Sequence, residues 1–314
     1  MTACSALVFP GQGSQTVGMG KELADNFAAA RQLFEEVDAA LGQKLSAIIF
    51  DGPQEILTLT ENAQPAIMAT SIATLRVMES EYGFNVASAT FVAGHSLGEY
   101  SALVAAGSLS VTDAARLLRV RGNAMQKAVP AGRGAMAALL GVDYVAAAEI
   151  AQAAAQDDIC AVANDNAPGQ VVVSGTKAAV ERAIEIAKMR GAKRAILLDV
   201  SAPFHCPLMA PAAGIMEEAL SAAKISTPSV PVVTNVTADA QIDPAILRRL
   251  LVDQVTGMVR WRESVSYMKN AGVTKMIEIG AGKVLSGLAK RIEPEMGTMN
   301  VGTMADLEAF ARVE

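Results

Sequence analysis

Histidine and cysteine are scarce among the 314 residues of this chain. Its three cysteines, Cys4, Cys160 and Cys206, are widely separated and odd in number, which argues against a disulfide framework. Its two histidines, together with the lack of any C-x-x-C pair, argue against a zinc site. The sequence therefore predicts no metal site.

Long apolar runs and excess basic charge are also missing, and aromatic residues are few. No stretch approaches the roughly 18 apolar residues of a membrane span. The N-terminus lacks the basic region of a signal peptide, so a cytoplasmic protein without a membrane partner is expected. The net charge of −6 argues against nucleic acid as the main partner. Because hydrophobic residues make up 52% and aromatic residues only 4%, the predicted core is aliphatic.

Strand and helix patterns alternate along most of the chain. Such alternation is typical of an α/β fold with a mainly parallel sheet. Strands are predicted at residues 5–9, 89–93, 230–234, 275–279 and 298–301. Helices are predicted at residues 21–41, 65–82, 97–106, 112–129, 244–254, 261–270 and 284–291.

The pattern changes after Pro130. A strand at 135–140 and a helix at 143–155 lead to two strands at 159–163 and 170–174, joined by a turn at 164–169, then a helix at 177–190 and a strand at 193–198. The order β-α-β-β-α-β is that of a ferredoxin-like unit. We therefore predict an inserted subdomain at 130–200 and a large domain made of 1–129 and 201–314.

A short motif follows the predicted strand at 89–93. Gly94-His95-Ser96-Leu97-Gly98 has the G-x-S-x-G pattern of a nucleophile elbow, a tight turn between a strand and a helix. The pattern alone matches many chains by chance, but here the required strand precedes it and the required helix follows it. Ser96 is therefore predicted to be a nucleophile.

A serine hydroxyl needs a neighbouring base, and histidine is the commonest one. His95 is the immediate neighbour of Ser96 on the turn, so its side chain is expected to leave in another direction. His205, far along the chain, is the remaining candidate. A serine and a distant histidine indicate acyl transfer through a covalent acyl-enzyme.

Several separated segments together carry a family resemblance. The chain resembles the malonyl-CoA:acyl carrier protein transacylases of fatty-acid synthesis at residues 9–15 (FPGQGSQ), 94–100 (GHSLGEY), 121–125 (RGNAM), 134–136 (GAM), 203–205 (PFH) and 280–282 (GAG). The resemblance implies an α/β-hydrolase-like large domain that carries a ferredoxin-like subdomain. It also implies malonyl-CoA and acyl carrier protein as partners, and no cofactor.

The resemblance implies roles for residues on the reaction path. Ser96 would be acylated by malonate, and His205 would be the general base. The main-chain carbonyl of Gln254 would orient that histidine in place of the usual triad acid. The backbone N–H groups of Gln12 and Leu97 would form the oxyanion hole.

Substrate binding is implied for three further residues. Arg121 would grip the free malonyl carboxylate, and Met125 belongs to the same motif. Phe204 precedes the histidine where some family members carry serine, and it resembles the malonyl-selecting form of related polyketide acyltransferases.

Three alternatives stay open from the sequence. One is a malonyl-selective acyltransferase of a polyketide pathway. Another is a serine esterase or thioesterase, although in such hydrolases the histidine follows an acidic residue late in the chain. The third is a carrier-docking subunit without chemistry, against which both Ser96 and His205 count.

Overall fold

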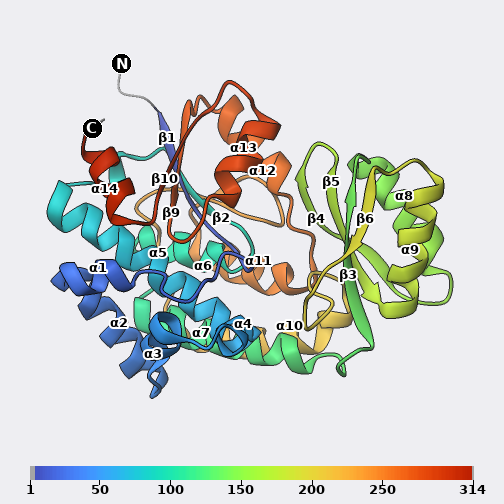
Figure 1. The fold of residues 1–314 in the computed structure, drawn as a ribbon, viewed down its shortest axis with the longest axis horizontal. Helices are drawn as coiled ribbons and strands as arrows, with labels where there is room; N and C mark the ends of the chain where they lie inside the picture. Colours follow the sequence, from blue (N-terminus) through green and yellow to red (C-terminus); the bar gives the residue numbers. More distant parts are fainter. Residues whose placement is uncertain (1–3, 313–314) are drawn as a thin grey trace.

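A computed structural model describes residues 4–312, and its strands form two separate sheets (Figure 1). The strands are β1 (Ser5–Phe9), β2 (Phe91–Gly94), β3 (Gly134–Leu140), β4 (Cys160–Ala167), β5 (Gln170–Thr176), β6 (Arg194–Leu197), β7 (Val232–Val233), β8 (Ala240–Gln241), β9 (Lys275–Ile279) and β10 (Gly297–Val301).

Helices cover both sheets. They are α1 (Lys21–Asn26), α2 (Ala28–Leu41), α3 (Leu45–Asp51), α4 (Gln54–Thr58), α5 (Thr60–Tyr82), α6 (Gly98–Ala105), α7 (Val111–Lys127), α8 (Tyr144–Ala155), α9 (Lys177–Met189), α10 (Ala210–Ala222), α11 (Pro244–Thr256), α12 (Trp261–Asn270), α13 (Val284–Ile292) and α14 (Met304–Ala311), with two short 3₁₀ turns at Val86–Ser88 and Pro207–Met209. Within residues 4–312, no helix is long and apolar enough to span a bilayer.

The larger sheet has six strands in the order β10-β9-β1-β2-β7-β8. All neighbours are parallel except β7 and β8, so the predicted mainly parallel sheet is confirmed. Leu7 and Phe9 of β1 enter one hydrophobic cluster, whereas Ala6 and Val8 enter another. Because helices bury both faces, this strand is apolar throughout instead of alternating.

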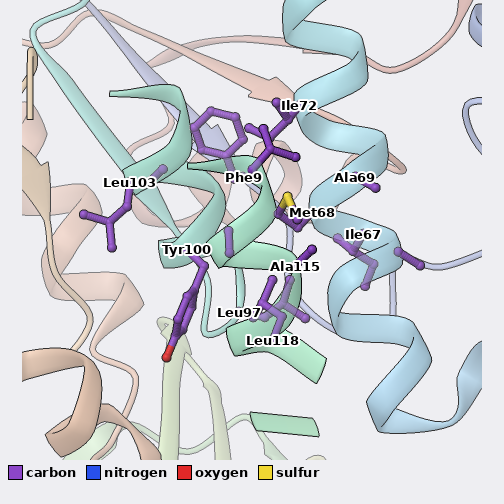
Figure 2. Packing of buried hydrophobic residues seen from close by; sticks show 14 of the residues in the cluster. Phe9, Ile67, Met68, Ala69, Ile72, Leu97, Tyr100, Leu103, Ala115 and Leu118 are labelled. Atoms are coloured by element: carbon purple, nitrogen blue, oxygen red, sulfur yellow. The ribbon is translucent and has the colours of Figure 1, made fainter. Parts of the chain in front are cut away.

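The first of these clusters lies around α5, α6 and α7. Figure 2 shows side chains of α5 beside those of the elbow region and α7, with few aromatic rings among them; the labelled residues are Phe9, Ile67, Met68, Ala69, Ile72, Leu97, Tyr100, Leu103, Ala115 and Leu118. This aliphatic packing fixes the helix that follows the elbow against its neighbours.

The smaller sheet is antiparallel, in the order β4-β5-β3-β6. Helices α8 and α9 lie together on one side of it (Figure 1) and share its hydrophobic cluster. The predicted ferredoxin-like arrangement is confirmed. That residues 130–200 form a separate domain stays a prediction.

Two local predictions were wrong. The turn predicted at 164–169 belongs mostly to β4, which continues to Ala167 with irregular register. Asn164, Asp165 and Asn166 have a turn-like composition, but β5 on one side and Val259 on the other offer them backbone partners. The helix predicted at 21–41 is broken at Phe27, whose backbone is extended.

Candidate active site

The elbow motif lies where the fold predicts it. Strand β2 ends at Gly94, α6 begins at Gly98, and Ser96 between them has a φ of 52°. A Cβ on Gly94 would lie 2.0 Å from the carbonyl carbon of Gly98, and a Cβ on Gly98 would lie 2.3 Å from the carbonyl oxygen of Phe9. Only glycine fits either position, so the turn is as tight as the motif requires.

Ser96 and His205 are brought together. The Oγ of Ser96 lies 2.8 Å from Nε2 of His205. On the other side of the ring, Nδ1 lies 2.9 Å from the carbonyl oxygen of Gln254 and 3.2 Å from that of Gly257. A carbonyl only accepts, so Nδ1 carries the proton and Nε2 accepts from the serine hydroxyl. Burial, and next the charge of Arg121, lower the pKa of His205 to about 3, which keeps it neutral.

His95 is engaged elsewhere, as predicted. Its Nε2 lies 2.8 Å from Oδ1 of Asn166, and its ring packs against Trp261 with centroids 5.7 Å apart. A Cβ on Gly11 would lie 2.7 Å from the His95 carbonyl oxygen, so the loop after β1 touches the elbow. His95 therefore connects the elbow to the smaller sheet.

Arg121, on α7, is 1% exposed and lies beside the serine. Its Nη2 donates to Ser96 Oγ at 3.1 Å and to Gln254 Oε1 at 2.8 Å, and its Nη1 donates to Gln64 Oε1 at 2.8 Å. Its Nε has no partner among the described residues. Because a buried guanidinium keeps its charge, this side chain presents a cation with spare donor capacity beside Ser96.

The Gln254 side chain also contacts the elbow, whereas the sequence predicted a role only for the main-chain carbonyl of this residue. Its Nε2 donates to the Ser96 carbonyl and to Oε2 of Glu99, both at 3.0 Å. Asn235 donates its N–H to the same Glu99 oxygen at 2.8 Å, while its Oδ1 accepts from Ser96 N–H at 2.7 Å. The buried side chains of Asn235 and Gln254 thus bind the backbone N–H and the carbonyl of Ser96 and fix the elbow.

A cavity of about 370 Å³ opens onto this group. Met125 and Phe204 line it, as do Gln12 and Ser96. The backbone N–H groups of Gln12 and Leu97 donate to no other described residue. Donors left free beside a nucleophile are able to stabilise an oxyanion.

Residues 4–312 contain no cluster of three or more His, Cys, Asp or Glu side chains that could hold a metal ion. The arrangement of Ser96, His205 and Arg121 supports nucleophilic acyl transfer with the chain's own groups.

Comparison with known proteins agrees with this chemistry. The family model of the acyl transferase domain matches residues 6–294. The chain belongs to the acyl transferase domain family. A malonyl CoA-acyl carrier protein transacylase of Bacillus subtilis (strain 168) is 50% identical over 304 residues, covering 96% of this chain and 95% of that protein. Its counterpart in Escherichia coli (strain K12) is 46% identical over 306 residues, covering 98% of this chain and 97% of that one.

Solved structures of acyl transferases have the same fold. An acyl-carrier-protein-S-malonyltransferase from Bartonella henselae is 55% identical, with a TM-score of 0.96 and 99% of both chains covered. A malonyl-transacylase in complex with a type II polyketide synthase acyl-carrier protein is 42% identical, with a TM-score of 0.96, covering 99% of this chain and 100% of that one.

Some residues around Ser96 were not predicted from the sequence. Asn166 lay in a segment predicted to be a turn, and Asn235 and Gln64 belong to no recognised motif. Glu99 was visible inside GHSLGEY, but only its burial marks it out.

Proposed function

We propose that this protein transfers a malonyl group from malonyl-CoA to the phosphopantetheine thiol of an acyl carrier protein through a malonyl ester of Ser96. The observation that carries the proposal is the buried Arg121 guanidinium, 3.1 Å from Ser96 Oγ. A fixed cation beside the nucleophile favours an acyl group that bears its own carboxylate.

The proposed first half-reaction forms the acyl-enzyme. Nε2 of His205 takes the hydroxyl proton as Ser96 Oγ attacks the thioester carbonyl. The N–H groups of Gln12 and Leu97 stabilise the oxyanion that develops. The C–S bond then breaks, and coenzyme A leaves as the thiol with the proton that His205 returns.

The second half-reaction reverses these roles. The carrier thiol gives its proton to His205 as its sulfur attacks the malonyl-serine ester. The C–O bond breaks, and Ser96 regains the proton. The Gln254 carbonyl keeps the ring in the tautomer that both steps need, and Arg121 binds the malonyl carboxylate, with Met125 and Phe204 beside the acyl chain.

No metal or prosthetic group enters this scheme, and we expect the enzyme to work without one in the cytoplasm. A malonyl-selective enzyme of a polyketide pathway would use the same chemistry. This alternative is supported by the similar malonyl-transacylase whose structure was solved in complex with a type II polyketide synthase acyl-carrier protein. Transfer rates with carriers from the two kinds of pathway distinguish them.

The decisive experiment is the intact mass of the protein after brief exposure to malonyl-CoA. A malonyl adduct that maps to Ser96 and disappears when a carrier protein is added is the expected result. The Ser96→Ala variant should acquire no adduct. Loss of the adduct to water at the same rate without carrier would instead identify a thioesterase, and an adduct on another residue would refute the nucleophile.

A further inference from the structure

Glu99 is a carboxylate in a place where carboxylates are rare. It is 1% exposed, and both donors to its Oε2 come from residues around the elbow: Asn235 N–H and Gln254 Nε2. Burial raises its pKa to about 7, while these two hydrogen bonds and then the charge of Arg121 oppose the rise. A buried ionisable group with such partners calls for a reason beyond packing.

Gln254 links this carboxylate to the arginine. Its Nε2 faces Glu99 and the Ser96 carbonyl, which leaves Oε1 for Arg121 Nη2. The direction of the amide is set by chemistry, because a carboxylate and a carbonyl only accept while a guanidinium only donates. In the series of hydrogen bonds from Arg121 through Gln254 to Glu99, every donor therefore faces an acceptor.

The indirect contact has a consequence for substrate binding. Arg121 forms no ion pair with a carboxylate of residues 4–312; its direct partners are Gln64, Ser96 and Gln254. A carboxylate placed directly on the guanidinium would occupy the donors that a malonyl carboxylate needs. In its ionised form Glu99 instead supplies negative charge one amide away, which stabilises the buried cation while the Nε donor of Arg121 stays without a partner among the described residues.

We propose that Glu99 is a positioning residue that, through the side chain of Gln254, holds Arg121 for a carboxylated acyl group and thereby sets the preference for malonyl over acetyl. This inference rests on the proposed malonyl transfer.

The test compares the specificity constants for malonyl-CoA and acetyl-CoA. Glu99→Gln keeps the shape and one acceptor oxygen but removes the charge. The malonyl-to-acetyl ratio should fall by about tenfold or more, as expected when a hydrogen-bonded charge is lost. A purely structural role would lower both constants together and leave the ratio unchanged. An unchanged or higher ratio overturns the proposal.

Two further variants show whether Glu99 acts through Gln254. Gln254→Leu removes the amide but keeps the main-chain carbonyl that binds His205, and its ratio should fall in the same way. Adding Glu99→Gln to that variant should change the ratio no further, because the link is already broken. A further fall in the double variant contradicts the relay. If Glu99→Gln does not fold, an unchanged ratio in Gln254→Leu still overturns the proposal.

Glu278→Gln is the matched control. Glu278, in β9, is also buried and accepts two backbone N–H bonds, from Leu285 at 3.0 Å and Ser286 at 2.8 Å, so its carboxylate binds the first turn of α13 and not the elbow. Its variant should lose stability while the ratio stays constant; an equal fall in the ratio would refute a specific role for Glu99. A wild-type protein that transfers no malonyl would refute the proposed function itself, which separates the two failures.

Discussion

Ser96 and His205 share an unusual backbone conformation, with φ angles of 52° and 56°. Residues other than glycine seldom adopt a positive φ, which costs of order 1–3 kcal/mol unless the surrounding structure imposes it. Here the surroundings are the elbow glycines on one side and the carbonyls of Gln254 and Gly257 on the other. Strain at two residues that face each other at 2.8 Å supports a shared function.

Arg121 yields the first prediction. Arg121→Ala should depress malonyl transfer by roughly 10²-fold or more while sparing acetyl transfer, since only malonate loses a charged partner. Arg121→Lys should recover part of the loss, because an ammonium lacks the planar fork of donors. The measurement is the ratio of specificity constants for the two thioesters. If the ratio is constant in a folded Arg121→Ala protein, the carboxylate is recognised elsewhere.

His205 yields a prediction for activity. His205→Gln should lower transfer by about 10²–10⁴-fold, the usual loss when a general base is removed. His95→Gln is the matched control, since it replaces the other histidine, which is partly buried, and leaves the hydrogen bond of His205 to Ser96 intact. A folded His95→Gln variant that loses more activity than His205→Gln would reverse the two assignments.

His205→Gln should also change the pH dependence of the free energy of unfolding. In the unfolded chain His205 takes up a proton near its ordinary pKa of 6.5, but in the folded protein burial delays protonation until about pH 3. The unfolded state therefore binds more protons between these values, and stability falls as pH drops through them. From pH 7 to pH 5 the wild type should lose roughly 2 kcal/mol more than His205→Gln. Urea unfolding at both pH values measures this, and equal losses would contradict the neutral buried imidazole.

Sequence alone predicted that Ser96 and His205 would meet better than it predicted the residues packed around them. Ser96 lies in a G-x-S-x-G motif, which specifies a tight turn between a strand and a helix, and the sequence has only two histidines that could be the base. For Gln254, the family resemblance implied only that its main-chain carbonyl orients His205. The contacts of its side chain depend on where α11 packs, and spacing along the chain carries no information on that.

At the scale of single elements, the elbow depends on its glycines. Gly98→Ala should destabilise the protein by several kcal/mol, because the new methyl group would lie 2.3 Å from the Phe9 carbonyl oxygen and neither backbone segment is free to move. Gly214→Ala in α10 is the control, since nothing lies within 4 Å of its Cβ position. That change should stabilise by up to about 1 kcal/mol. Urea unfolding of both variants checks the pair, and equal effects would contradict the close approach.

Element types were predictable where hydrophobic patterns were regular. Strand β1 is a short, mostly apolar run, and α5 follows a long helical pattern. The end of β4 was not predictable, because Asn164 to Asn166 favour a turn by composition and become a strand only through partners distant in sequence.

At the scale of the whole molecule, β4 ties the two sheets together. Asp165 N–H donates to the Val259 carbonyl at 3.0 Å, and its carboxylate pairs with Arg262 at the start of α12 at 2.7 Å. Asn164 and Asn166, on either side of Asp165, line the active-site cavity. The same short segment thus joins the smaller sheet to the chain around Val259 and the start of α12, and lines the cavity beside Ser96.

Arg262→Met therefore tests the connection between the two sheets. Asp165 is 1% exposed, so the variant leaves a buried carboxylate without its cation, and we expect a loss of about 2–3 kcal/mol in the free energy of unfolding, discounted because Arg262 is partly exposed. Arg260→Met is the control, because the Glu263 carboxylate that pairs with Arg260 is 32% exposed, so this pair should contribute less than about 1 kcal/mol. Adding Asp165→Asn to Arg262→Met should restore most of the stability, since it removes the unpaired charge.

Displacement of β4 in Arg262→Met should also lower the specificity constants for malonyl-CoA and acetyl-CoA together, because His95 loses its hydrogen bond to Asn166 while Arg121 keeps all its partners. Full stability in Arg262→Met, or no recovery in the double variant, would show that this ion pair does not hold the two parts of the molecule together.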